Sequence, residues 1–331
     1  LGVQVPADES AGLHTGTVTV TTASAGTKEV TVTLDVQSEV AGNHGFDDPE
    51  FMTRLSWLNS TVGTDPDFVI APFHPVRVNG KTLEVLGRTV ELGASGLPDG
   101  IYSAFAPELT HFLDTSQPIL AEPLSFDVRS GGERVDMQSS AYTVTQVARG
   151  RVEWETTNRS TQLEMRVEGA LEYDGMLDYR VTWRALEDMN LDELALPVAI
   201  QPEAADYMLG LGHKGGRIPD SVDWKWAIEN HQEGVWLGGI EKGLQYVLRD
   251  DDYQRPLNTN FYQNQPLRMP ASWSNDGQGG IRIETTPGAV TATNYSGPRS
   301  MSAGEELHYN VRFLITPFKP IDTREHFETR F

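Results

Sequence analysis

The sequence predicts an all-β protein in which a β-hairpin precedes one large, supersandwich-like antiparallel β-sandwich, with few and short helices. Segments that alternate apolar and polar residues recur from Thr17 to Thr316, which is typical of strands with one buried face. Turns rich in Gly, Pro and Asn separate these segments, and helical periodicity is rare between them. This combination favours a sandwich over an α/β architecture.

The first predicted element is a hairpin formed by residues 17–21 (TVTVT) and 30–36 (VTVTLDV), with a turn at Ser24–Thr27. Two strands alone are marginally stable in water, so we expect the pair to belong to a larger sheet. It either docks on the main body or forms the last strands of an immunoglobulin-like segment. We assign residues 1–37 to that segment and residues 38–61 to a linker with a short helix.

The linker helix is predicted over residues 47–60 (DDPEFMTRLSWLNS), where Asp48 can cap and Pro49 suits the first helical position. A second helix is predicted at the C-terminal end, because Asp322 followed by Glu325 forms an acidic capping box. We interpret residues 321–331 as the start of a helix that leads to a further domain.

The large sandwich is predicted over residues 62–320. Its clearest alternating strands are 144–147, 152–155, 163–167, 177–185, 281–284 and 307–316. Residues 194–200 (LALPVAI) are almost continuously apolar and therefore predict a strand buried on both faces.

Composition excludes several classes of function. The chain of 331 residues has 26 Lys and Arg against 47 Asp and Glu, a formal net charge of −21. Binding to a nucleic-acid backbone or an anionic membrane needs clustered positive charge, and neither is expected. The chain has no cysteine, which excludes disulfides, zinc-thiolate sites and thiol nucleophiles. No apolar run is long enough to span a membrane.

No complete catalytic motif is present, and we expect no cofactor and no metal site. The segment 210–216 (GLGHKGG) predicts a turn between strands, because it lacks the spacing of a dinucleotide fingerprint. The run Asp250–Asp252 is interpreted as a solvated loop, with a calcium site as the alternative. The adjacent acids at 187–188 and 192–193 are expected in a turn. Three N-x-S/T sequons occur, at Asn59, Asn158 and Asn294.

Two regions combine aromatic and polar side chains, which is the mixture that binds sugars. The candidate carbohydrate-binding residues in segment 207–236 are His213, Lys214, Arg217, Trp224 and Trp226, and those in segment 270–280 are Trp273, Asn275 and Asp276. The alternative is structural: the tryptophans pack within the sandwich, and the second segment is an ordinary solvated turn.

Several segments resemble a known family: 54–65 (RLSWLNSTVGTD), 75–101 (PVRVNGKTLEVLGRTVELGASGLPDGI), 207–226 (YMLGLGHKGGRIPDSVDWKW), 235–248 and 295–322. In this order they are similar to the N-terminal β-sandwich region of glycoside hydrolase family 123. The resemblance implies a following TIM-type barrel, whose adjacent Asp-Glu pair cleaves β-linked N-acetylhexosamines with assistance from the substrate. That barrel is absent from residues 1–331, so no catalytic residue is assigned.

We therefore expect the sandwich portion of a secreted, periplasmic or cell-surface glycoside hydrolase-like protein acting on amino-sugar or other glycans. It would scaffold a catalytic barrel, as a domain or a partner chain, and line the sugar cleft. One alternative is a stand-alone carbohydrate-binding protein. The other is a sugar epimerase or lyase in which the sandwich itself is the enzyme, and the residues nominated for it are His213, His231, Arg217 and Glu229.

Overall fold

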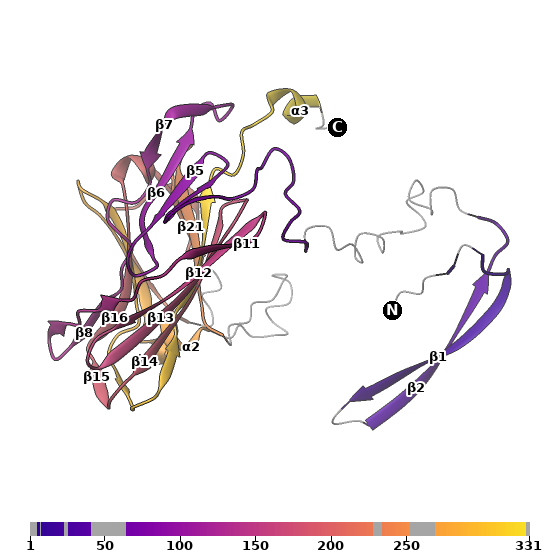
Figure 1. Cartoon of the computed structure of the whole chain (residues 1–331), viewed down its shortest axis with the longest axis horizontal. Helices are drawn as coiled ribbons and strands as arrows, with labels where there is room; N and C mark the ends of the chain where they lie inside the picture. Colours follow the sequence, from indigo (N-terminus) through magenta and orange to yellow (C-terminus); the bar gives the residue numbers. More distant parts are fainter. Residues whose placement is uncertain are drawn as a thin grey trace. The chain divides into compact units, whose positions relative to one another are not determined.

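The computed structural model describes residues 5–6, 8–22, 26–40, 64–227, 234–251 and 269–328. The chain divides into two compact units, Leu1–Asp65 and Pro66–Phe331, which are drawn in Figure 1. The predicted linker helix over residues 47–60 lies outside the described residues.

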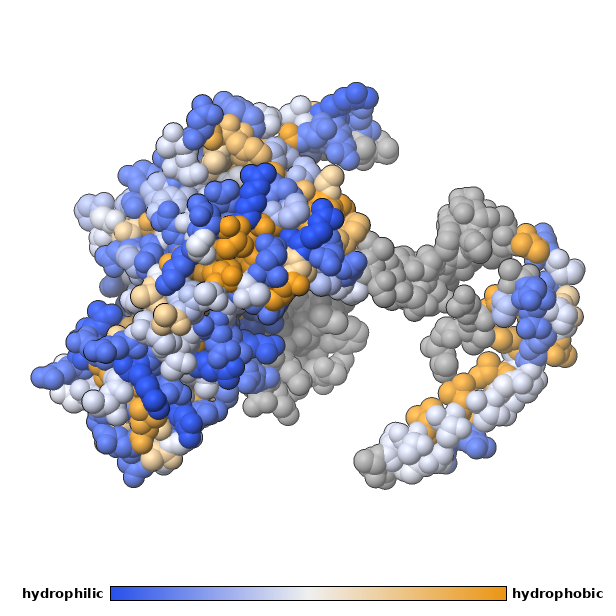
Figure 2. All heavy atoms as spheres, viewed as in Figure 1, coloured by the Kyte–Doolittle hydropathy of each residue, from blue (hydrophilic) through white to orange (hydrophobic). Residues whose placement is uncertain are grey.

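The first unit contains the predicted hairpin. Strand β1 (Gly12–Thr22) pairs with β2 (Gly26–Val36) in an antiparallel register that places Val18 opposite Val30. Alternation gives the pair one face rich in Val and one rich in Thr. The apolar face is not covered by other described residues of the unit: Val20 and Val30 are 48% and 53% exposed, and orange spheres follow the hairpin in Figure 2. Its origin in an immunoglobulin-like segment stays a prediction.

The second unit is built from antiparallel sheets. The described residues form a five-stranded sheet in the order β3 (Arg77–Asn79), β4 (Thr82–Val85), β5 (Arg88–Leu92), β6 (Pro98–Phe105) and β7 (Phe112–Pro118). A described six-stranded sheet has the order β19 (Ser221–Lys225), β22 (Gly280–Thr285), β23 (Val290–Tyr295), β16 (Glu193–Ile200), β8 (Asp127–Ser130) and β9 (Glu133–Arg134).

The largest sheet has eleven strands within the same described part of the chain. Its order is β10 (Gln138–Ser139), β12 (Arg151–Arg159), β13 (Leu163–Glu172), β14 (Met176–Ala185), β26 (Asn310–Thr316), β21 (Gly243–Arg249), β20 (Gly234–Gly238), β17 (Tyr207–Gly210) and β18 (His213–Arg217). In addition, β11 (Val144–Ala148) pairs with β12, and β25 (Glu306–His308) pairs with β14. A separate pair joins β15 (Met189–Leu191) to β24 (Arg299–Met301).

Helical segments are short in the described part of the chain. They are α2 (Ala271–Ser274), α3 (Thr323–Glu328) and the 3-10 turns η3 (Pro202–Ala204) and η5 (Asn275–Gly277). At α3 the Asp322 carboxylate accepts a hydrogen bond from the Glu325 backbone N–H at 3.0 Å, as the capping pattern predicts. No helix among the described residues is long and apolar enough to cross a membrane.

Alternation along the central strands explains the sandwich. Along most of β12, β13 and β14 every second residue is buried and its neighbours are charged or polar; the exception is a run of three buried residues, 169–171, in β13. Strand β16 is buried almost throughout, as its apolar run predicts. The inward residues of all three large sheets join one hydrophobic core, whereas hydrophilic residues dominate the face visible in Figure 2. The prediction of an all-β sandwich is therefore confirmed.

An aromatic cluster lies at the centre of this core. Phe126 contacts the Trp183 ring edge-on at 5.5 Å and lies 6.3 Å from the Trp273 ring. Trp273 in turn meets Tyr309 edge-on at 4.7 Å. These residues come from β14, α2, the segment preceding β8 and the segment preceding β26, so the cluster ties the six-stranded sheet to the eleven-stranded one. Burial of such large rings supplies much of the hydrophobic stabilisation.

A buried arginine connects the five-stranded sheet to the eleven-stranded one. The Arg88 guanidinium donates hydrogen bonds to the backbone carbonyls of Leu86 (2.9 Å), Asp174 (2.7 Å), Ile315 (3.0 Å) and Phe318 (2.9 Å). Arg88 is only 2% exposed to solvent. Desolvation lowers the pKa of Arg88 to about 10, and the nearby Asp174 charge opposes that shift. The side chain therefore stays charged at neutral pH.

Candidate functional site

The sequence-predicted sugar-binding residues fall in separate places. His213, Lys214 and Arg217 all lie on β18, an exposed edge strand. Successive side chains of a strand point to opposite faces, so Lys214 faces away from the other two. Arg217 covers the Tyr207 ring at 5.8 Å. A sugar-binding role for these three residues stays a prediction. Of the cluster nominated for an epimerase or lyase, His231 and Glu229 lie outside the described residues.

The three candidate tryptophans are core residues. Trp224, Trp226 and Trp273 are 7%, 3% and 0% exposed. The rings of Trp224 and Trp226 pack edge-on against each other at 4.9 Å, and the Trp273 Nε1–H donates to the Asn310 carbonyl at 3.2 Å. A ring that stacks on a sugar must expose its face, so this burial corrects the sugar-stacking interpretation in favour of the packing alternative.

The remaining pair of candidates lies at the end of α2. Asn275 donates through Nδ2 to the carbonyls of Ser296 (2.7 Å) and Pro298 (3.0 Å), which fixes the loop. Asp276 follows with a positive φ of 52°. Both residues therefore lie in an ordered turn next to β22, and the hydrogen bonds of the Asn275 side chain hold this turn to the backbone at Ser296 and Pro298.

The acidic pairs have structural partners. Glu187 accepts a hydrogen bond from the Gln162 amide at 2.7 Å, and Asp192 accepts one from the Gly132 N–H at 2.6 Å. Among the described residues, no group of three His, Asp or Glu side chains is placed to hold a metal ion. Two sequon asparagines, Asn158 and Asn294, are fully buried, and Asn59 lies outside the described residues.

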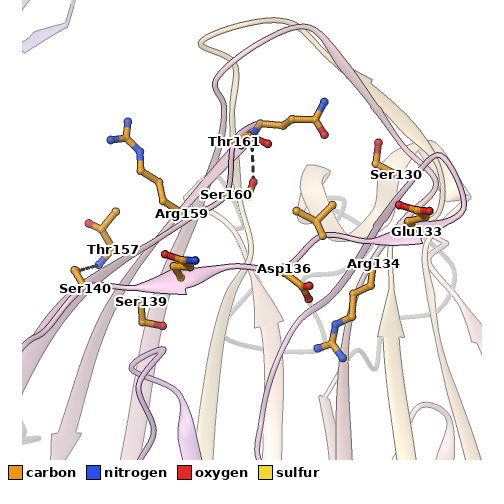
Figure 3. Close-up of a pocket in the computed structure, with 13 residues that line it drawn as sticks. Ser130, Glu133, Arg134, Asp136, Ser139, Ser140, Thr157, Arg159, Ser160 and Thr161 are labelled. Carbon is orange, nitrogen blue, oxygen red and sulfur yellow. Dashed lines mark hydrogen bonds between the residues drawn. The ribbon is translucent and has the colours of Figure 1, made fainter.

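The strongest candidate site is a polar hollow of about 920 Å³ at one end of the sandwich, which is shown in Figure 3. It lies between the β8–β9 hairpin, β10, and the turn that joins β12 to β13. Its lining residues are almost all polar: Ser130, Glu133, Arg134, Val135, Asp136, Gln138, Ser139, Ser140, Thr157, Arg159, Ser160, Thr161 and Gln162. The volume is within the range of small-ligand pockets.

Local sequence shapes two walls of this polar hollow. Gly131 and Gly132 have φ of 61° and 82° and form the two-residue loop of the β8–β9 hairpin, a conformation that other residues adopt only with strain. On the opposite wall the Ser160 hydroxyl accepts hydrogen bonds from the N–H groups of Gln162 (3.2 Å) and Leu163 (2.9 Å). This Ser turn fixes the β12–β13 connection.

The floor of the polar hollow is held by hydrogen bonds from β10 to β12. The Ser139 hydroxyl donates to Asn158 Oδ1 at 2.5 Å, and the Ser140 hydroxyl accepts from the Thr157 N–H at 3.1 Å. Asn158 itself is anchored by a hydrogen bond to the Ser95 carbonyl at 3.2 Å. Hydrogen bonds within the chain therefore hold the floor in this arrangement without a ligand, and preorganisation of this kind reduces the entropic cost of binding.

Several polar side chains of the polar hollow are available to a ligand. Within the described residues, the side chains of Glu133, Asp136, Gln138 and Thr161 make no hydrogen bond or ion pair. The two arginines are exposed and pair with half-buried carboxylates: Arg159 meets Glu164 at 2.9 Å and Arg134 meets Asp127 at 4.0 Å. Figure 3 shows Arg134 and Arg159 on different sides of the hollow. Ion pairs with such an exposed arginine contribute little to stability and can be exchanged for a ligand.

This donor and acceptor set suits a polyhydroxylated ligand. Carboxylates and amides accept hydrogen bonds from sugar hydroxyls, and guanidinium groups donate to hydroxyl and ring oxygens. None of the described residues that line the polar hollow is aromatic, so binding to them would depend on hydrogen bonds rather than on ring stacking.

Sequence reasoning did not identify this hollow. Its residues lie within 130–162, a stretch that has strand patterns and the Asn158 sequon but neither an aromatic cluster nor a catalytic or ligand-binding motif. The signals that were present are the Gly-Gly turn and the dense Ser and Thr of residues 139–140 and 160–161, which are common in solvated turns and are not specific. Only the β10–β12 register, with Ser139 opposite Asn158, brings them together.

The antiparallel sheets and the hydroxyl-rich hollow define an all-β sandwich protein with a polar ligand-sized site. Residues 76–317 match the family model of glycoside hydrolase 123, third domain. This match covers more than half of the chain, and the chain therefore belongs to that family, as the sequence resemblance predicts.

The solved structures to which the chain is similar are distant. A galactose mutarotase related enzyme from Lactobacillus acidophilus is 8% identical, with a TM-score of 0.41 over 73% of this chain and 98% of that one. A Synechocystis protein is 10% identical, with a TM-score of 0.42 over 75% and 99%. An aldose epimerase homologue from C. elegans is 7% identical, with a TM-score of 0.39 over 73% and 98%. These likenesses are too distant to identify an activity. No curated protein matches the chain.

Proposed function

We propose that this glycoside hydrolase-related chain is a carbohydrate-binding β-sandwich and that the polar hollow of Figure 3 is its glycan site. The observation that carries the proposal is the set of polar side chains that have no partner among the described residues and lie over a hydroxyl-rich floor held by internal hydrogen bonds. Membership of a glycoside hydrolase family makes a glycan the natural ligand class.

Within a larger assembly, the sandwich scaffolds a catalytic barrel, present as a domain or a partner chain, and lines its sugar cleft. Amino-sugar glycans are the proposed substrate class, because the family resemblance implies them. We place the protein in a secreted, periplasmic or cell-surface setting, where polymeric glycans are met. A stand-alone carbohydrate-binding protein is the alternative, and it uses the same hollow.

Calorimetric titration with a panel of oligosaccharides tests the proposal. Glu133→Gln and Asp136→Asn each remove a charged acceptor and are expected to weaken binding about tenfold, the effect of losing one hydrogen bond to a charged group. Glu122→Gln is the matched control, because Glu122 is also exposed but does not line the hollow. Equal affinities for all these proteins would contradict the assignment of the site.

A further inference from the structure

A second surface of the protein has the properties of a ligand site: the outer face of the eleven-stranded sheet. Here alternation turns the polar residues of β12, β13, β14, β21 and β26 outward. Two adjoining hollows, of about 700 and 440 Å³, lie on this face and share Glu168, Asp178 and Arg180. We call the smaller one the outer-face hollow; its lining also includes Thr182, Arg249, Asp250, Asp251, His308, Asn310 and Arg312.

Two carboxylates of the outer-face hollow are neutralised by arginines. Asp178 receives a two-pronged pair of hydrogen bonds from Arg312, at 3.1 and 3.0 Å. This hydrogen bond raises the pKa of Arg312, against the opposing effect of burial. Glu168 receives a hydrogen bond from Arg166 at 3.1 Å.

The other two carboxylates are also engaged. Asp251 accepts a hydrogen bond from the Asn310 amide at 2.8 Å and lies 3.3 Å from His308 Nδ1. Asp250 accepts a hydrogen bond from the Ala271 backbone N–H. Every acid of the outer-face hollow therefore has a partner within the chain.

Arg180 is different. It lies directly opposite Glu168 in the β13–β14 register, yet Glu168 is engaged by Arg166, and Arg180 makes no ion pair or hydrogen bond with any described residue. His308 lies opposite Thr182 on the same face, which makes Arg180 and His308 diagonal cross-strand neighbours. Diagonal side chains are separated by about 7–8 Å at their backbones, a distance that long side chains span. Because His308 Nδ1 faces Asp251, the ring's Nε2 is left for a ligand.

We propose that the outer-face hollow binds the carboxylate of a uronic acid residue within a glycan, with the Arg180 guanidinium as the principal anchor and His308 beside it. Arginine presents a planar fork of N–H donors that matches a carboxylate in a two-pronged geometry. The paired acids and amide around it are then placed to accept and donate hydrogen bonds with the hydroxyls of the same sugar. This inference rests on the proposed glycan-binding function and names a ligand class for a second site.

The net charge of the protein favours a carboxylate over a sulfate as the anionic group of the ligand. The net charge of −21 repels dense polyanions over several ångströms at physiological ionic strength. A highly sulfated chain carries several charges per repeat and meets this repulsion in full. A uronic acid residue in an otherwise neutral glycan brings one charge to one uncommitted guanidinium.

The test is calorimetric titration of the whole chain with three oligosaccharides of equal length: one neutral, one containing a single glucuronic acid, and one sulfated. The uronate ligand is expected to bind about tenfold more tightly than the neutral one, and Arg180→Gln is expected to remove that preference. Arg184→Gln is the matched control, because Arg184 is an exposed arginine on the same strand but does not line the outer-face hollow.

The outcomes separate the two proposals. Binding of the neutral ligand that depends on Asp136, with no preference for the uronate, would overturn the uronate inference and leave the polar hollow of Figure 3 standing. An unchanged preference in Arg180→Gln, or a stronger affinity for the sulfated ligand, would also overturn it. Unaltered thermal unfolding of both arginine variants excludes misfolding as the cause.

Discussion

Arg88 leads to the most specific prediction, which concerns the contact between the five-stranded and the eleven-stranded sheet. Replacing it by Met keeps the length and apolar stem of the side chain and removes four hydrogen bonds to backbone carbonyls. Hydrogen bonds to charged groups contribute about 1.5–3 kcal/mol each. The variant also escapes the cost of burying the charge: the lowered pKa of Arg88, about 10 instead of 12.5, corresponds to about 3 kcal/mol.

The net expectation is that Arg88→Met lowers the free energy of unfolding by at least about 3 kcal/mol, because even the lower estimate for four hydrogen bonds, about 6 kcal/mol, exceeds the cost of burying the charge by that amount. Urea unfolding followed by circular dichroism measures it. Arg77→Met is the control, because Arg77 is an exposed arginine on strand β3 of the same five-stranded sheet, and we expect a change below about 0.5 kcal/mol. A loss in Arg88→Met that does not exceed the control would refute the reasoning.

Two further predictions concern the core. Trp273→Ala is expected to cost about 3–5 kcal/mol of stability by opening a cavity, while Trp273→Phe keeps most of the packing and should cost clearly less; equal losses in urea unfolding would argue against the aromatic cluster. Desolvation raises the pKa of the three buried phenols of Tyr179, Tyr246 and Tyr309 above its usual range. Above pH 10 the unfolded chain therefore releases protons that the folded chain retains. Stability must therefore fall as the pH rises, by about 1.4 kcal/mol per tyrosine at pH 11. The lowered pKa of Arg88 acts in the opposite direction over the same range, which leaves a net loss of about 3 kcal/mol between pH 9 and pH 11. Equal free energies of unfolding from urea titrations at pH 9 and at pH 11 would contradict this prediction.

The strand pattern was predictable because alternation is a local property. Residues 177–185 predict a strand, and β14 covers Met176–Ala185; residues 281–284 fall within β22. Segment 307–316 reads as one strand but divides into β25 and β26 around Tyr309. Tyr309 is fully buried against the Trp273 ring, so tertiary packing interrupts a segment whose local pattern is continuous.

The candidate site was not predictable in the same way. Alternation shows that Trp224 lies on one face of a strand, but not whether that face is inside or outside the sandwich. The residues of the Figure 3 hollow carry no periodic signal, since they acquire their arrangement from the β10–β12 register and from the β8–β9 turn. Likewise, Arg180 looks like any exposed strand arginine until its cross-strand neighbour is seen to be engaged elsewhere.

The central claim, that the Figure 3 hollow binds a glycan, is tested most directly by hydrogen–deuterium exchange of the whole chain with and without the tightest-binding oligosaccharide. We expect slower amide exchange in residues 130–140 and 157–162, the two segments that contain the lining residues of the hollow, with little change in β18. Protection confined to β18 and its turn, with none in the two segments that line the hollow, would contradict the account and return the site to His213, Lys214 and Arg217.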